Sequence, residues 1–414
     1  MGNYCGGLWC GGSDDDENAS NEDLMRQYKG PSSDSLLRTV KNPDVGSLIE
    51  IEHEAKQNFH DKFILGRKLG SGSFATVYEC GEIATQKTYA CKVYDRHQLD
   101  AGALECALTE PFLLRRMYHP GIVRCQGFYK EDNMYILVME ELRGGDVFDK
   151  LREMKDDIHE RDVCRLVKMF LEALTYIHAR NIVHRDLKLE NLMLDSPSPT
   201  SSTLKIVDFG FAIQLPHKEA TLTEVLGTPG YMAPEVIQGG PYGKPADVWS
   251  AGVIVYTLLC GYPPFHHDRI KNIQTLFRSI CCGFYFFDSV YWSDISLEAK
   301  DLVSKMLRVN PAERATAAEL LQHEWFARQQ PPLPVSPRGA TANTLKAIGP
   351  LRSFNRILKA RVADQHRHDS AHDDTQLRQL AEDKIQALEK RPEFPPPVDL
   401  SKSKLLPATR YNVQ

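Results

Sequence analysis

The sequence predicts an α+β fold with two lobes, a small β-rich lobe followed by a larger, mostly helical lobe. Residues 63–69, 89–93 and 134–139 are short segments with aromatic and aliphatic side chains typical of strands. Residues 161–180 carry apolar side chains at helical spacing. The apolar run from Ala251 to Tyr262 is too short to cross a bilayer, so we expect it to be a buried core helix.

The composition of the 414 residues is that of an ordinary globular protein, with 42% hydrophobic and 25% charged residues. The net charge of −5 gives no indication of nucleic-acid binding. Ten cysteines are present, but no Cys-x-x-Cys pair recurs at zinc spacing. With no recognisable signal peptide, the sequence predicts reduced thiols in a cytoplasmic protein.

The N-terminus resembles a lipid-attachment sequence. Gly2 could be myristoylated after removal of Met1, and Cys5 could then be palmitoylated, which would give a stable peripheral membrane anchor. Gly6 stands where the usual pattern has Ser or Thr, so a flexible glycine-rich tail is an equal alternative. Residues 13–23 are acidic and polar and are expected to be disordered.

A glycine-rich hairpin follows the first predicted strand. Gly70 and Gly72 allow backbone amides to approach phosphate oxygens. Ala75 replaces a third glycine, and two glycines in a hairpin usually only turn the chain, so the motif is weak by itself. The residues expected to cover a nucleotide are Leu69, Gly70, Ser71, Gly72, Ser73, Phe74, Ala75 and Val77.

A lysine on the next strand supports this nucleotide site. Strand alternation places Ala90 and Lys92 on one face, where Ala90 would pack on adenine and Lys92 would contact the α- and β-phosphates. A buried lysine needs an anionic partner, for which Glu110 is the candidate and Glu105 the alternative. Pro111 predicts a kink or a late helix start beside Glu110.

The strand at residues 134–139 leads into a predicted hinge between the lobes. Backbone groups from Glu140 to Leu142 would hydrogen-bond adenine, and Met139 would limit the back of the pocket. Asp146 is expected to cap the next helix and could also reach a ribose or a basic substrate residue.

Residues 181–192 contain the groups that phosphoryl transfer from ATP requires. Asp186 would orient the attacking hydroxyl and accept its proton, Lys188 would neutralise the migrating phosphoryl group, and Asn191 would help to hold Mg²⁺. The stretch matches the pattern His-Arg-Asp-Leu-x-x-x-Asn without a gap, which is far more specific than the His-Arg-Asp tripeptide.

Three later residues complete the predicted site. Asp208, in the sequence Asp-Phe-Gly, is the expected second Mg²⁺ ligand. Thr228 is expected to hydrogen-bond to Asp186 and Lys188. Asp247 is expected to begin a core helix and to accept hydrogen bonds from the catalytic-loop backbone.

The order of these motifs resembles the eukaryotic protein kinases over residues 63–326. Lys188 and the sequence Gly-Thr-Pro-Gly-Tyr at 227–231 are similar to the Ser/Thr branch. Within that branch, the strings at 241–249, 261–265, 299–303 and 323–326 resemble the calcium/calmodulin-dependent kinase group.

This resemblance implies a bilobal protein kinase fold, in which the small lobe has five strands and one main helix. It also implies ATP and Mg²⁺ as cofactors. Substrates would be proteins with basic residues near the target Ser or Thr, and Glu190 and Asp146 would receive a substrate arginine.

The activation segment contains Thr221 and Thr223 next to Glu224. Arg185 could receive a phosphate there. Glu224 could partly substitute for that phosphate, which would make phosphorylation helpful but not obligatory.

The C-terminal part of the chain predicts a regulatory tail. Residues 327–344 read as a Pro-rich linker, and residues 345–363 are basic and amphipathic, with Leu351, Phe354 and Leu358 at apolar positions. Such a helix could bind calmodulin and resembles the regulatory helix of calmodulin-dependent kinases. The alternative is a helix that only packs on the large lobe. No EF-hand loop occurs in the sequence, so calcium would act through a separate protein.

The leading hypothesis is therefore an active Ser/Thr protein kinase controlled by C-terminal regulatory helices. The alternative is a pseudokinase scaffold, but such scaffolds typically lack Asp208 or Asn191, and both residues are present. We expect a disordered tail at 1–60, a kinase domain at 61–326, the linker at 327–344, the regulatory helix at 345–363, and a short amphipathic helix with a disordered end at 364–414.

Overall fold

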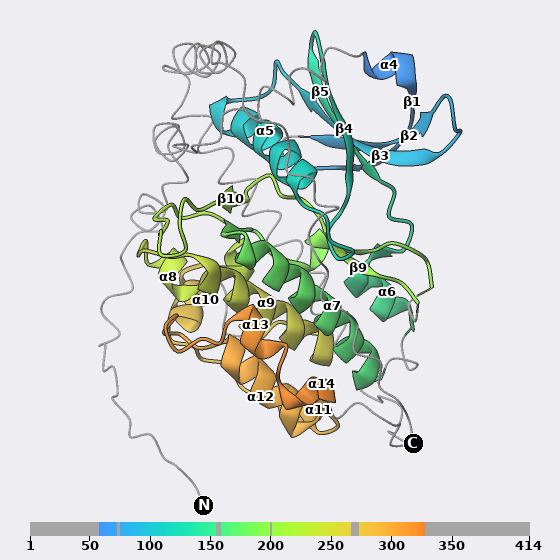
Figure 1. The fold of residues 1–414 in the computed structure, drawn as a ribbon. Helices are drawn as coiled ribbons and strands as arrows, with labels where there is room; N and C mark the ends of the chain where they lie inside the picture. Colours follow the sequence, from blue (N-terminus) through green and yellow to red (C-terminus); the bar gives the residue numbers. More distant parts are fainter. Residues whose placement is uncertain (1–57, 73–74, 155–158, 199–200, 266–272, 328–414) are drawn as a thin grey trace, which may run out of the picture.

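The protein has two lobes, a sheet with one long helix and a larger helical lobe below it (Figure 1). The expected α+β, bilobal fold class is therefore confirmed. The computed structural model describes residues 58–72, 75–154, 159–198, 201–265 and 273–327, and every structural statement below concerns these residues.

The small lobe is a five-stranded antiparallel sheet in the order β1-β2-β3-β5-β4, as expected. The central strand β3 places Lys92 opposite Val77 of β2 and Leu137 of β5. Each of the three predicted strand segments is present and slightly longer than expected. The strands are β1 (Phe63–Ser71), β2 (Thr76–Glu82), β3 (Thr88–Asp95), β4 (Cys125–Glu131) and β5 (Met134–Glu140).

Helix α5 (Ala101–Arg116) is the long helix of the small lobe and contacts β4. Its first turn is capped by Asp100, whose side chain accepts a hydrogen bond from the Ala103 amide at 2.7 Å. Pro111 lies inside the helix, so the expectation of a late helix start was wrong. The proline removes a single amide donor, and the capped first turn starts the helix well before it.

The short helix α4 (Phe59–Lys62) precedes the sheet and was not expected. Phe59 is completely buried, with its ring 5.4 Å from that of Phe63 and 5.7 Å from that of Tyr129. The folded unit therefore begins before residue 61, which corrects the boundary of the expected 1–60 tail. The contact of α4 with the sheet depends on the single residue Phe59. One residue gives no periodic pattern from which the sequence could predict this contact.

Two long helices, α7 (Glu160–Ala179) and α9 (Lys244–Cys260), form the centre of the large lobe. Helix α9 begins before Asp247, because Pro245 suits the first turn of a helix. It is buried along nearly all its length and ends at Gly261, whose φ of 89° is left-handed. Among the helices of the described residues, none has both the length and the apolar character needed to cross a bilayer.

The other elements of the large lobe surround these helices. Glu160 ties the end of the domain to α7, because its Oε1 accepts a hydrogen bond from Trp325 Nε1 at 2.6 Å. The elements are β6 (Gly145–Asp146), α6 (Val147–Met154), β7 (Ile182–Val183), η3 (Leu189–Asn191), β8 (Leu192–Leu194), β9 (Leu204–Ile206), β10 (Ile213–Gln214), η4 (Pro229–Tyr231), α8 (Pro234–Ile237), α10 (Ile273–Cys281), α11 (Ser289–Trp292), α12 (Leu297–Met306), α13 (Ala317–Leu320) and α14 (Glu324–Ala327).

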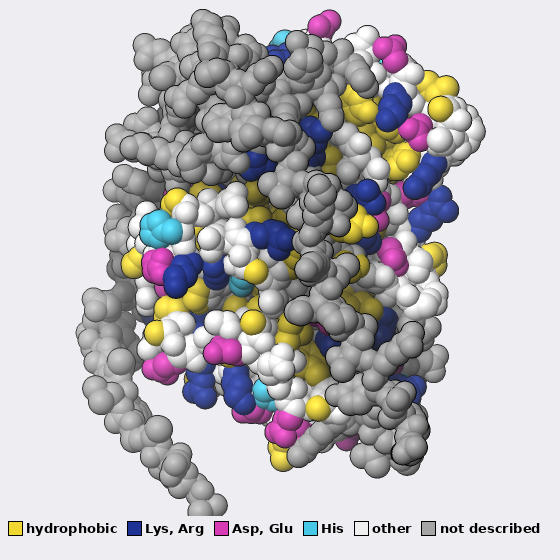
Figure 2. Space-filling view, viewed as in Figure 1, with side chains coloured by type: hydrophobic (Ala, Val, Ile, Leu, Met, Phe, Trp, Pro, Cys, Tyr) yellow, Lys and Arg dark blue, Asp and Glu magenta, His cyan; other side chains and the backbone are white. Residues whose placement is uncertain are grey.

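The surface carries charges of both signs. On the coloured part of the face in Figure 2, Lys and Arg side chains are interspersed with Asp and Glu side chains. All eight cysteines among the described residues are free thiols.

Candidate active site

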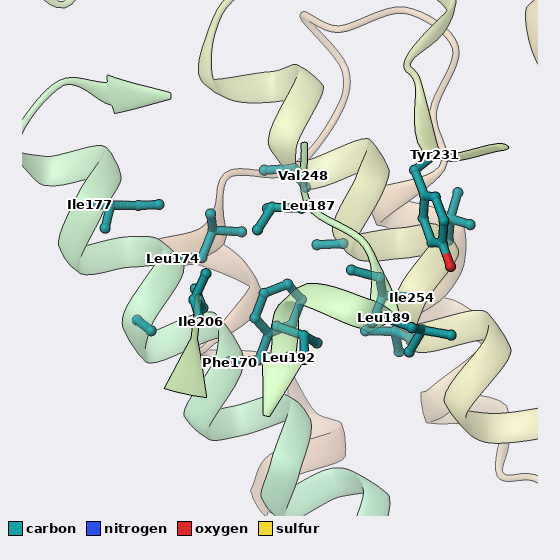
Figure 3. Packing of buried hydrophobic residues seen from close by; sticks show 14 of the residues in the cluster. Phe170, Leu174, Ile177, Leu187, Leu189, Leu192, Ile206, Tyr231, Val248 and Ile254 are labelled. Atoms are coloured by element: carbon teal, nitrogen blue, oxygen red, sulfur yellow. The ribbon is translucent and has the colours of Figure 1, made fainter. Parts of the chain in front are cut away.

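The catalytic loop is fixed by three leucines that point into the large-lobe core. Leu187, Leu189 and Leu192 are all buried and lie between side chains of α7 and α9 (Figure 3). Figure 3 also shows Phe170 and Leu174 of α7 next to these leucines. Asp186, Lys188 and Asn191 each adjoin at least one of these leucines in the chain and are thereby held in fixed positions.

Lys188 and Thr228 bind the side-chain carboxylate of Asp186, and Asn191 binds its backbone carbonyl. Lys188 Nζ donates to Asp186 Oδ2 at 2.5 Å. Thr228 Oγ1 donates to Asp186 Oδ1 at 2.6 Å, which is the Asp186 part of the contact predicted for Thr228. Asn191 Nδ2 donates to the Asp186 carbonyl at 2.9 Å. The Asn191 amide nitrogen is therefore engaged, and its side-chain oxygen is the atom available to a cation.

Asp247 supports the loop from below, as the sequence predicted. Its carboxylate accepts hydrogen bonds from the amides of His184 at 2.8 Å and Arg185 at 3.0 Å, and from His178 Nε2 at 3.0 Å. Burial would raise the pKa of Asp247, but the hydrogen bond from His178 and the nearby imidazoles outweigh it and keep the pKa below its ordinary value. These bonds hold Arg185 at a φ of 68°, which is left-handed and unfavourable for a non-glycine residue.

Lys92 connects the two lobes through two ion pairs. Its Nζ lies 2.7 Å from Glu110 Oε2 and 2.7 Å from Asp208 Oδ1. Burial opposes the charge of Lys92, but the carboxylates of Asp208 and Glu110 outweigh it and raise the pKa of Lys92 well above its ordinary value. The predicted Lys92–Glu110 pair is therefore present, and Glu105 is not needed as the alternative partner.

Asp208 is ionised in this arrangement. Desolvation raises its pKa, but the ammonium groups of Lys92 and Lys188 outweigh that effect and the pKa of Asp208 lies well below its ordinary value. Its side chain is 41% exposed, so a ligand can reach it. Asp208 also has a left-handed φ of 63°, and this strained turn aims the carboxylate toward Lys92.

Glu110 accepts hydrogen bonds from more groups than the sequence predicted. Its Oε1 accepts from the Phe209 amide at 3.0 Å, and its Oε2 accepts from the Tyr94 hydroxyl at 2.8 Å as well as from Lys92. The sequence analysis did not identify Tyr94, although strand alternation places it on the same face of β3 as Lys92, which precedes it by two residues.

The nucleotide-facing side of the small lobe has the expected register. Ala90 pairs with Met139 across β3 and β5, and Val77 pairs with Lys92 across β2 and β3. A Cβ atom added at Gly70 would meet no protein atom within 4 Å, so open space lies next to this backbone. Leu69, Gly70, Ser71, Gly72 and Ala75 are described, whereas Ser73 and Phe74 lie outside the described residues.

The side chain of Glu140, the first hinge residue, is engaged in contacts other than adenine binding. Glu140 Oε1 accepts hydrogen bonds from the Arg124 amide and, in an ion pair, from Lys205 Nζ, each at 2.8 Å. Recognition of adenine at Glu140 to Leu142 would therefore fall to backbone groups.

The donor set fits Mg²⁺ that arrives with a nucleotide. Mg²⁺ prefers oxygen ligands and is usually held by one or two carboxylates together with substrate phosphates. Asp208 offers one ionised carboxylate and Asn191 one amide oxygen. Within the described part of the chain, no group of three or more His, Cys, Asp or Glu side chains could hold a metal without such help.

Two acidic residues were expected to receive a basic substrate side chain. Asp146 caps α6, because its Oδ1 accepts from the amides of Phe148 at 2.8 Å and Asp149 at 3.0 Å. Glu190 lies on η3, which packs against α6. Its Oε2 is buried and has no hydrogen-bond partner among the described residues, which leaves a carboxylate oxygen that a cation would satisfy.

The activation segment is tied to the catalytic loop by an ion pair. Arg185 Nη1 donates to Glu224 Oε2 at 2.8 Å, and both side chains are only 8% exposed. Arg185 Nε also donates to the Phe211 carbonyl at 2.5 Å. Thr221 and Thr223 are exposed, whereas Glu224 of the same segment forms the ion pair with Arg185.

The expected lipidation residues Gly2 and Cys5 lie outside the described residues, as do the tail residues Leu351, Phe354 and Leu358. The structure therefore describes the catalytic and nucleotide-facing groups but not these predicted regulatory and anchoring segments.

Comparison with known proteins agrees with this arrangement. The protein kinase domain family matches residues 63–326. The calcium/calmodulin-dependent protein kinase type II subunit delta of Oryctolagus cuniculus is 37% identical over 296 residues, which cover 72% of this chain and 55% of that relative. The calcium/calmodulin-dependent protein kinase type IV of Homo sapiens is 39% identical over 297 residues, covering 71% of this chain and 61% of the relative. The type IV enzyme of Mus musculus is 41% identical over 295 residues, with the same coverage of 71% and 61%. The aligned region thus spans less than two thirds of each of these relatives.

Proposed function

The chain belongs to the protein kinase family, within the calcium/calmodulin-dependent kinase group, and from this premise we propose that it transfers the γ-phosphate of ATP to Ser or Thr side chains of proteins. Mg²⁺ held by Asn191 and Asp208 would neutralise phosphate charge in this reaction. Asp186 would orient the substrate hydroxyl and accept its proton, while Lys188 would offset the charge of the phosphoryl group.

One observation carries this proposal: Asp186 is held by Lys188 and Thr228 on a loop that also positions Asn191, and Lys92 links Asp208 to Glu110 across the lobes. This set favours an active enzyme over a pseudokinase scaffold, because a scaffold has no need for all of these groups. Radiolabel transfer from ATP to a basic Ser/Thr peptide tests the proposal. Magnesium-dependent incorporation is expected, and its complete absence in a folded sample would contradict the proposal.

The proposed substrates carry basic residues close to the target Ser or Thr. The support is the buried Oε2 of Glu190, which has no partner within the ranges that the structure describes, since such an oxygen is costly until a cation reaches it. Matched peptides with Arg or with norleucine upstream of Ser provide the test. Glu190→Gln should reduce the preference for Arg and leave the rate on the norleucine peptide close to that of the parent.

Control by Ca²⁺–calmodulin through residues 345–363 is the regulatory part of the proposal. The support is the basic, amphipathic pattern of these residues and the names of the relatives, which are calcium/calmodulin-dependent kinases. Leu358→Glu should abolish binding and activation by Ca²⁺–calmodulin. Ser353→Glu adds the same charge on the opposite face of a helix and is the matched control. Equal binding by both variants would contradict the proposed site.

The proposed location is the cytoplasm, with peripheral membrane attachment through an acylated N-terminus if the chain starts at Met1. The support is Gly2 at the second position and Cys5 close by. Mass spectrometry of the N-terminal peptide expressed in eukaryotic cells checks it. Myristate on Gly2 that disappears in Gly2→Ala is the expected result, and an unmodified peptide would contradict the proposal.

A further inference from the structure

Tyr94 lies next to both members of the ion pair in the small lobe. It is on β3, two residues after Lys92, and is only 2% exposed. Its hydroxyl donates to Glu110 Oε2 at 2.8 Å, and Lys92 Nζ lies 5.6 Å from the centre of its ring. One side chain therefore contacts the carboxylate that aims the lysine and also the lysine itself.

Glu110 depends on its hydrogen-bond donors because it is completely buried. Within the described part of the chain, its hydrogen-bond donors are Lys92, Tyr94 and the Phe209 amide. Lys92 is shared with Asp208, and the Phe209 amide belongs to the start of the activation segment. The Tyr94 hydroxyl, by contrast, is not shared with Asp208 and does not belong to the activation segment; it comes from β3, the central strand of the sheet.

The backbone next to Glu110 makes the position of its side chain more dependent on the Tyr94 hydroxyl. Pro111 lacks an amide, so the helical hydrogen bond to the Ala107 carbonyl is missing at this point of α5. The position of the Glu110 side chain therefore depends more on contacts outside the helix. Burial, together with the negative charge of Glu110, raises the pKa of Tyr94 well above its ordinary value, so that the phenol stays a donor.

We propose that Tyr94 is a positioning residue whose hydroxyl holds Glu110 in place, so that Lys92 is aimed at the phosphates of ATP. This inference rests on the proposed function. It predicts a role in phosphate binding, and it separates Tyr94 from a core tyrosine that serves folding alone.

Tyr94→Phe tests this role because it removes the hydroxyl and keeps the buried ring. A hydrogen bond to a charged group is strong, so we expect MgATP to bind about tenfold more weakly. Adenosine has no phosphates and does not need Lys92, so its affinity should stay at the parent value. The KM for MgATP should rise more than kcat falls. Isothermal titration and steady-state kinetics measure these quantities.

Tyr256→Phe is the matched control. Tyr256 lies in the large lobe and is 1% exposed; its hydroxyl donates to the Phe286 carbonyl at 2.8 Å and lies 3.0 Å from the Tyr262 hydroxyl. This variant should lower the melting temperature and leave the affinity for MgATP unchanged.

A double-mutant cycle with Lys92→Met tests whether Tyr94 acts through the lysine. In the Lys92→Met background, Tyr94→Phe should have no further effect on MgATP affinity. Parent-like MgATP affinity of Tyr94→Phe, an equal loss of adenosine affinity, or a full tenfold effect in the Lys92→Met background would each overturn the inference. A parent protein that binds adenosine but shows no added affinity for MgATP would overturn the proposed function together with it.

Discussion

The two polar networks of the site are built in opposite ways. In the large lobe, Asp186, Lys188 and Asn191 come from one loop, with hydrogen-bond partners two and five residues apart. In the small-lobe network, Lys92 pairs with Glu110 at a separation of 18 residues and with Asp208 at a separation of 116 residues. The first network lies mainly on one loop, to which Thr228 adds a bond from 42 residues away, and the second joins three separate elements.

This difference shows which part of the site can be regulated. The local network is fixed by leucines in the large-lobe core, so it keeps its geometry whenever that lobe is folded. The long-range network exists only while β3, α5 and the start of the activation segment lie in their present positions. Variants in the large-lobe network should therefore change the chemical step, and variants in the small-lobe network should change nucleotide binding.

Asp186→Asn should have the largest effect. Loss of a positioned general base is expected to reduce kcat by about 10²- to 10⁴-fold, while the affinity for MgATP stays close to the parent value. Single-turnover phosphoryl transfer and direct nucleotide titration measure the two quantities separately. Activity equal to that of the parent would defeat the mechanism.

Glu110→Gln should act mainly on binding. The amide cannot neutralise Lys92, so the KM for MgATP should rise by about tenfold, with a smaller fall in kcat. Glu105→Gln, on the same helix, is the matched control and should keep parent kinetics. A selective loss of kcat in Glu110→Gln would remove the contrast between the two networks.

His184 should make the stability of the large-lobe network depend on pH. It is completely buried beside Phe209, with ring centres 4.8 Å apart, and burial lowers the pKa of its imidazole below 6.5. Because the unfolded chain takes up this proton first, stability is full above pH 6.5 and falls as the pH drops below that value. One such histidine changes the free energy of unfolding by at most about 1.4 kcal/mol per pH unit.

Urea unfolding between neutral and mildly acidic pH checks this dependence. His184→Asn should reduce the slope of stability against pH. His217→Asn changes an exposed histidine and is the matched control. An unchanged slope in His184→Asn would show that other groups cause the dependence.

Glu224 should have the smallest effect, because it acts on the order of the activation segment. Glu224→Gln weakens the pair with Arg185 and should lower kcat/KM for a peptide by about fivefold. Thr223→Ala should match the parent, since Thr223 is exposed and Glu224 already occupies Arg185. A large loss in Thr223→Ala would mean that a phosphate at Thr223, rather than Glu224, organises the segment.

Much of the fold and site followed from local patterns. Strand alternation identified the shared face of Ala90 and Lys92, and the catalytic-loop spacing identified Asp186 and Asn191, because both signals repeat over a few residues. The sequence did not reveal the Tyr94–Glu110 hydrogen bond or the burial of Phe59. Each of these depends on a single side chain that meets a distant element, and no local pattern records such a meeting.

The sequence by itself determined which chemical groups this protein carries, since motif spacing and side-chain type are local properties of the chain. The tertiary structure alone decided which of several candidates serve as partners. It paired Lys92 with Glu110 and not with Glu105, and it placed Glu224 on Arg185. The physical reason is that a buried charge takes the partner that packing brings within hydrogen-bond distance, and packing depends on the whole chain.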